Sequence, residues 1–374
     1  MGNIQLSSES VFSFSRLLKE NISAWVKGTT GEYIDSNTTL NWYNAAYNSA
    51  KKILSLDSFR YTPTQSLDSV MANAAFQKDY ITLKTGAVTM SGFNLESFEK
   101  DSSLVADVIE INQPLLTVYR DKAPPFLEGN LKPLPVDMIR NITMPVDVGT
   151  LKMNDGTLHY TERNAKTRAE GTLDLTRMNA RVSNLKNRNL TDTDSLVFSL
   201  DAFLMDSSLL NLMVKESYTD SLRGFLMTLR LKPTTVSLLN PVLVPLSNVL
   251  ITSGTIDSFQ LNAIGREDLA IGEMQMYYHD LRIKLIKNGD PSKTNFMGRV
   301  ANFLVNSFVI RKNNKGRTGL VFYERAKDRS FFNYLVKITF SGMATSIGVK
   351  KNRKYMKEYK RELKERNLPG FYFK

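Results

Sequence analysis

GEMQMYYHDLRIKLI, residues 272–286, is the stretch that decides the fold. Side chains of a strand point alternately to its two faces, so Met274, Met276 and Tyr278 share one face. The apolar series restarts out of phase directly after the His-Asp pair that follows. One extra residue at a β-bulge produces such a change of phase. The stretch therefore predicts a long, half-buried strand with a bulge at His279–Asp280.

The same pair raises the alternative of a metal or phosphoester site, because imidazole is a common nitrogen ligand of transition metals. Such a site normally recruits further histidine or cysteine ligands. The chain has one other histidine, His159, far upstream in the sequence, and it has no cysteine. The pattern therefore favours a strand irregularity over a metal site, and we expect neither a metal nor a cofactor.

The composition is that of a basic globular protein. Of the 374 residues, 42% are hydrophobic and 23% charged, and the net charge is +12. This balance is typical of a folded chain, and the absence of cysteine excludes disulfides and thiolate chemistry. The positive charge raises the alternative of nucleic-acid binding. The basic residues are dispersed except near the C-terminus, however, and no nucleic-acid-binding signature occurs, so no nucleic-acid partner is expected.

No pattern of catalytic residues stands out. The sequence has no glycine-rich phosphate loop after a strand and no Gly-x-Ser-x-Gly. A serine triad would have to use His159 or His279. A carboxylate pair such as Asp155 and Glu162 carries little weight in a chain with 37 acidic residues. We therefore expect a protein that is not an enzyme.

The hydrophobic period divides the chain into three segments. Residues 1–79 are predicted to form an N-terminal helical or mixed segment, with helical spacing most clearly in Leu40–Leu56. The period changes to two in residues 80–348, which read as successive strands separated by turn residues. Within them the proline-rich stretch Arg120–Met138 predicts a linker or crossover. Residues 349–374 are predicted to contain a basic amphipathic helix.

A sheet of amphipathic strands has one continuous apolar face. If helices cover that face, it is a core. If it curls and stays open, it is a groove able to hold acyl chains. Periodicity alone leaves both alternatives open.

Part of the chain resembles a known family. NVLITSGTIDSFQLNAIGREDLAIGEMQMYYHDLRIKLI resembles the C-terminal β segment of AsmA-like envelope proteins of Gram-negative bacteria, with Tyr278, Asp280 and Leu281 in its Tyr-x-Asp-Leu strand. VGTLKMNDGTLHYTER followed by EGTLDLTRMNARVSNL resembles the preceding paired-strand unit. The likeness spans roughly Tyr80–Gly348.

The resemblance implies a mainly β fold: a long curved antiparallel sheet forming an open hydrophobic groove, with short helices at the N- and C-terminal ends. It implies lipid binding or conduction in the periplasm or cell envelope, at the inner membrane, and a role in outer-membrane assembly or lipid homeostasis. The family's membrane anchor has no visible counterpart, because the sequence shows neither a signal peptide nor a long apolar run, so we expect either a cytosolic protein or a truncated chain. The alternative is a structural envelope or adhesion module with a closed core.

Two sets of residues are candidates for binding. For phospholipid acyl chains in the groove, the candidates are Phe259, Leu261, Met274, Met276 and Tyr278. The C-terminal helix carries an apolar stripe among basic residues, which is typical of a helix at the surface of an anionic membrane. Its candidates are Lys350, Lys351, Arg353, Lys354, Tyr355, Lys357, Tyr359 and Leu363. In the alternative interpretation the same stripe packs against the end of the sheet.

Overall fold

The protein is described here by a computed structural model, which places residues 29–34, 37–220, 224–286, 311–349 and 351–365. These residues form one large sheet of 17 strands with a few short helices. Strands account for 52% and helices for 19%, so the predicted mainly β fold is confirmed.

Most strands are short in the N-terminal part of the chain, and the longest ones lie from Val146 onward. The strands are β1 (Thr29–Ile34), β2 (Thr38–Asn48), β3 (Ile53–Leu56), β4 (Ser58–Pro63), β5 (Asp79–Lys84), β6 (Val88–Ser91), β7 (Leu104–Asn112), β8 (Leu115–Asp121), β9 (Val146–Arg163), β10 (Glu170–Lys186), β11 (Ser195–Leu204), β12 (Ser208–Ser217), β13 (Phe225–Leu231), β14 (Thr234–Thr235), β15 (Val249–Gly265), β16 (Leu269–Leu285) and β17 (Gly319–Glu324). The helices are α2 (Leu67–Ala72), α3 (Leu95–Asp101), α4 (Pro135–Arg140), the 3-10 helix η1 (Val236–Leu239), α5 (Asn240–Ser247), α7 (Phe331–Ile347) and α8 (Lys351–Glu365).

Pairing sets the order of the sheet from β1 at one edge to β17 at the other. After β2, two short strands share each position: β4 with β3, β5 with β6, and β8 with β7. The long strands β9 to β13, then β15, β16 and β17, follow in sequence. All pairings are antiparallel except those of β9 with β7 and β8. Parallel strands need a crossover, and residues 122–145, within and just after the predicted proline-rich stretch, provide it.

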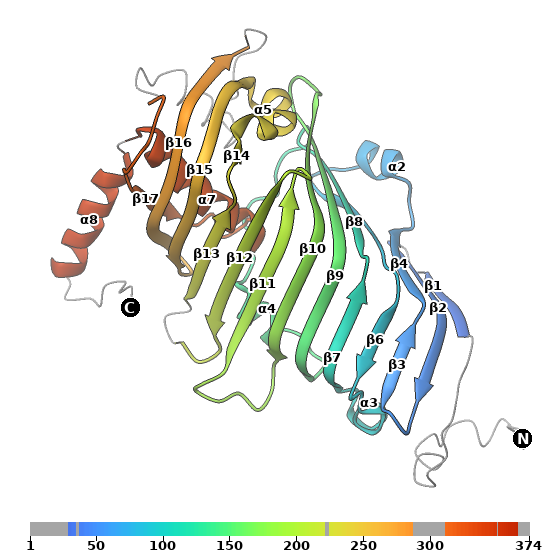
Figure 1. The fold of residues 1–374 in the computed structure, drawn as a ribbon. Helices are drawn as coiled ribbons and strands as arrows, with labels where there is room; N and C mark the ends of the chain where they lie inside the picture. The colour runs from blue at the N-terminus through green and yellow to red at the C-terminus, as the bar shows by residue number, and fades with distance from the viewer. Residues whose placement is uncertain (1–28, 35–36, 221–223, 287–310, 350, 366–374) are drawn as a thin grey trace, which may run out of the picture.

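One face of the sheet is apolar across most of its width, and we call it the inner face. Cross-strand partners build it, as in the row Leu83, Leu116, Leu158, Leu175 and Leu204, which crosses β5, β8, β9, β10 and β11. Figure 1 shows the curved sheet with α4 and α7 behind it, on the side of the inner face.

The predicted bulge in β16 is confirmed. Tyr278 and Leu281 are both buried, whereas His279 and Asp280 between them are exposed. The pairing of β15 with β16 shifts register opposite this point, and Asp280 has a φ of 54°. His279 Nδ1 lies 3.1 Å from Asp257 Oδ2 on the neighbouring strand. The pair is therefore a feature of the strand.

The helical prediction for Leu40–Leu56 is wrong, because these residues form β2 and β3. The same physics that shifts the phase of β16 explains the error. Trp42 and Tyr47 both occupy inner-face positions, although they are five positions apart, an odd number, and Asn44 between them has a φ of 51°. This irregularity makes an alternating strand imitate helical spacing. The sheet also continues across residue 80, since β4 pairs with β5.

The predicted basic C-terminal helix is present as α8, and a second helix, α7, precedes it. α7 begins after Ser330, whose hydroxyl accepts a hydrogen bond from Asn333 N at 3.2 Å, as an N-cap residue does. It ends at Gly348, where φ is 126°. α8 follows directly and packs on β17.

Candidate functional site

The inner face is covered unevenly. The helices α4, α5 and α7 pack on β10, β12 and β15 to β17. Toward the N-terminal half of the sheet, the inner-face residues Leu83, Leu116 and Leu158 remain partly exposed. We call the inner-face residues of β4, β5 and β8 to β11 the open inner face. Its centre, Leu175 and Leu200, is buried only within a local apolar cluster.

This open inner face is continuous with the main hydrophobic core. Phe198, Leu210 and Leu212 are partly buried and pack against both the local cluster and the larger cluster beneath α7. Apolar contact therefore runs without a break from β9 to β17.

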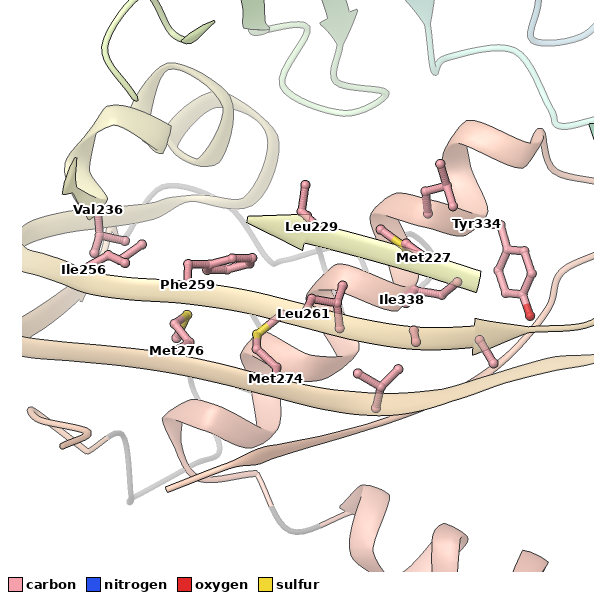
Figure 2. Close-up of a cluster of buried hydrophobic side chains, with 14 of the residues drawn as sticks. Met227, Leu229, Val236, Ile256, Phe259, Leu261, Met274, Met276, Tyr334 and Ile338 are labelled. Atoms are coloured by element: carbon pink, nitrogen blue, oxygen red, sulfur yellow. The ribbon is translucent and has the colours of Figure 1, made fainter. Parts of the chain in front are cut away.

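The five predicted groove residues all lie on the inner face, in the larger cluster. Figure 2 shows four of them, Phe259, Leu261, Met274 and Met276. Leu261 pairs with Met274, and Phe259 pairs with Met276. Leu261 and Met274 are fully buried where α7 approaches closely: a methyl group at Gly342 would lie 2.8 Å from Met274 Cε. At these positions the apolar face is a filled core.

Met276 and Tyr278 differ from the other three because they line a pocket of about 730 Å³. The pocket lies between η1, α5, β15 to β17 and α7. Its remaining apolar lining includes Val236, Leu239, Leu243, Ile251, Leu281, Met343 and Ile347. A pocket of this size and character is ordinary for a site that holds a small apolar ligand. Two cationic residues, Arg325 and Lys337, also belong to the lining.

Two chain segments meet over the inner face, and we call residues 122–134 and 325–329 together the roof. Lys132 N donates a hydrogen bond to Lys327 O at 2.7 Å. The Arg325 guanidinium donates to Lys132 O. The Arg329 guanidinium lies 3.1 Å from the centre of the Phe126 ring. These contacts fix the crossover to the β17–α7 connection, which lies far from it in sequence.

A cluster of charged residues lies below the roof, at the end of β5, β8 and β9. Arg120 forms a two-point ion pair with Asp79, and Lys122 Nζ lies 3.5 Å from Glu162 Oε2. Burial lowers the pKa of Lys122, and the positive charges of Arg120 and Arg329 act in the same direction, against Glu162. Burial also lowers the pKa of Arg329. The cluster holds cations in a poorly solvated place.

The sequence analysis missed this cluster. The sequence feature that could have revealed it is a pair of charged residues at inward-facing strand positions. These residues, Arg120 and Glu162, are direct cross-strand partners. A second missed group is Glu216, a carboxyl on the inner face of β12 that is 3% exposed. Its side chain accepts a hydrogen bond from Val136 N of α4 at 3.0 Å.

The apolar stripe of α8 packs on the sheet. The rings of Tyr355 and Tyr359 lie 5.6 Å and 6.0 Å from the Phe322 ring. Asn352 donates to Leu320 O at 2.8 Å and to Ser341 Oγ at 2.8 Å. The two tyrosines therefore pack against the sheet, as the alternative interpretation of the stripe expects. The basic residues of α8 lie on the opposite side of the helix.

The remaining predicted membrane-surface residues divide by what the structure describes. Arg353, Lys354 and Lys357 are exposed. Lys350 and the side chains of Lys351 and Leu363 lie outside the described part of the chain.

Among the described residues, no group of three or more acidic, histidine or cysteine side chains is arranged to hold a metal ion. In the same part of the chain, none of the helices is both long and apolar enough to span a membrane. No protein-family model matches the chain, and no curated protein matches it.

Proposed function

We propose that this protein is a non-enzymatic lipid-binding protein whose inner face holds phospholipid acyl chains. The observation that carries the proposal is the row of partly exposed leucines on β5, β8 and β9, which are cross-strand partners. Leu158 packs in the local cluster, which shares Phe198, Leu210 and Leu212 with the larger cluster beneath α7. Water at such a surface is costly, at about 25 cal/mol for each Å² of apolar area. An acyl chain would remove that area from water.

The alternative is a structural module whose apolar face is a closed core. Beneath α7 the face is filled, as Leu261 and Met274 show. Leu83, Leu116 and Leu158 are different, because the described residues bury them only in part. An extended apolar surface on a folded protein normally marks a place where something binds. This contrast favours the lipid-binding function over the structural one.

The proposed setting is the periplasmic side of a Gram-negative envelope, next to an anionic membrane surface, with a role in lipid transport or outer-membrane homeostasis. The exposed face of α8 supports membrane contact, because Arg353, Lys354, Lys357, Lys360 and Arg361 all project from it. Basic residues near an anionic leaflet contribute about 1 kcal/mol each.

The proposal is tested by purifying the protein from cells, extracting it with organic solvent and analysing the extract for phospholipid. We expect phospholipid to co-purify and a fluorescent phospholipid to bind the extracted protein. Ala344→Trp, which fills part of the pocket, should weaken that binding, whereas Met213→Trp on the opposite face of β12 should not. Absence of both co-purified and added lipid would rule the proposal out.

A further inference from the structure

The open inner face changes character along the strands. Down β8 and β9, the cross-strand partners on the inner face are Arg120 with Glu162, then Val118 with Tyr160, then Leu116 with Leu158. Each step is two residues, or about 7 Å. An ionic end therefore passes into an apolar floor within one strand length. This is the polarity profile of an amphiphile, with a charged head and an apolar tail.

Each cation at this end has a carboxylate neighbour, but only the pair of Arg120 with Asp79 is close. Both carboxylate oxygens of Asp79 accept hydrogen bonds from the Arg120 guanidinium. Glu162 accepts a hydrogen bond from Tyr160 OH at 2.6 Å, and lies at the longer distance of 3.5 Å from Lys122 Nζ. An ammonium group has three donors, and 3.5 Å is long for a hydrogen bond. Lys122 thus retains capacity for a closer anionic partner.

Arg329 faces the same place from the roof. Its Nε lies 3.6 Å from Asp328 Oδ1, again a long ion pair. It acts electrostatically on both Arg120 and Lys122, although it belongs to a connection far away in sequence. Three cations from two distant segments therefore converge, and their side chains are between 20% and 33% exposed. The carboxylates beside Lys122 and Arg329 lie 3.5 Å and 3.6 Å away, which leaves both cations able to donate a shorter hydrogen bond to an incoming anionic group.

We propose that Arg120, Lys122 and Arg329 form a headgroup site, and that the lipid bound on the inner face is an anionic amphiphile with a carboxylate or phosphate head. This inference rests on the proposed lipid-binding function and names the substrate class of the same face. Lys122 and Arg329 donate hydrogen bonds to the anionic head, with Arg120 as a fixed positive charge beside them. The tail follows Val118 and Leu116 toward the centre of the sheet.

The test compares ligands that share a tail and differ in the head. Oleate is anionic and oleyl alcohol is neutral, and each is titrated against the protein loaded with the neutral dye Nile red. We expect oleate to displace the dye at about a tenfold lower concentration than oleyl alcohol, because charge-assisted hydrogen bonds are about twice as strong as neutral ones. Inorganic phosphate, which has the charge without the tail, should not displace the dye.

Two variants assign the effect to the site. Lys122→Gln on the crossover and Arg329→Gln on the β17–α7 connection should each raise the oleate concentration needed by about tenfold and leave oleyl alcohol unchanged. Lys215→Gln, at an exposed position on the outer face of β12, is the matched control and should change neither. Melting temperatures identify any variant that weakens binding because it is less well folded. Because the two variants lie on separate segments, the test still stands if one of them folds poorly.

The outcomes separate this inference from the function on which it rests. Equal displacement by oleate and oleyl alcohol in the unaltered protein would overturn the headgroup site while supporting lipid binding. Equal weakening of both ligands in the two variants would also overturn it, as would displacement by inorganic phosphate alone. If neither oleyl compound displaces the dye, both proposals fail.

Discussion

Glu216 illustrates at the scale of one residue what an inward-facing polar group undergoes in this fold. Burial raises the pKa of its carboxyl group to about 7. The hydrogen bond from Val136 N opposes this shift, Asp137 adds to it, and the charges of Arg140 and Arg325 oppose it. These neighbours belong to α4 and to the roof, so the protonation of Glu216 is coupled to the way the crossover packs on the sheet.

The pH dependence of stability follows from the direction of this shift. Because the pKa of Glu216 in the folded state lies above its ordinary value of 4.5, the folded protein binds this proton more tightly than the unfolded chain. The resulting stabilisation is complete below about pH 4.5 and is lost as the pH rises through 7. We expect the free energy of unfolding, measured by urea denaturation, to fall by up to about 3 kcal/mol between roughly pH 5 and 8.

Substitution at this position isolates the effect. Glu216→Gln should flatten the pH dependence in that interval, whereas Glu273→Gln, at an exposed position on β16, should preserve it. A Glu216→Gln variant that keeps the full slope would show that other groups cause it.

At the scale of elements, strand irregularities separate what the sequence could predict from what it could not. In β16 the alternation is clear on both sides of His279–Asp280, so the bulge is readable from the sequence alone. In β2 the irregularity near Asn44 joins two short alternating runs, Leu40 with Trp42 and Ala45 with Tyr47, and together they have helical spacing. A period is reliable only when each run is long enough to show its own alternation.

α8 divides its two predicted roles between its two sides. Tyr355 and Tyr359 pack on Phe322, and the basic residues face outward. We expect the double substitution Arg353→Glu and Lys357→Glu to abolish sedimentation with anionic liposomes and to leave the melting temperature nearly unchanged. Tyr355→Ala should do the reverse, lowering stability by about 1 kcal/mol while liposome binding persists. Undiminished sedimentation of the charge-reversed protein would remove α8 from the membrane contact.

At the scale of the whole molecule, the sequence predicted the apolar face but not its cover. The candidates Phe259, Leu261, Met274, Met276 and Tyr278 do share one face, because alternation fixes that property locally. Which of them lie in a filled core depends on where α7 packs. The roof likewise depends on contacts such as Lys132 with Lys327, which no local pattern encodes. Hence the face was predictable, and the pocket and the charged cluster were not.

The most direct test of acyl-chain binding on the inner face uses adjacent residues of one strand. Leu212 points to the inner face of β12, and Met213 points to the outer face, where it is 50% exposed. A photoreactive amino acid is placed at each position in turn, cells are irradiated, and the purified protein is analysed for attached lipid. We expect phospholipid adducts at position 212 and none at position 213, despite the greater exposure of 213. Adducts at 213 alone, or at neither position, would contradict lipid binding on this face.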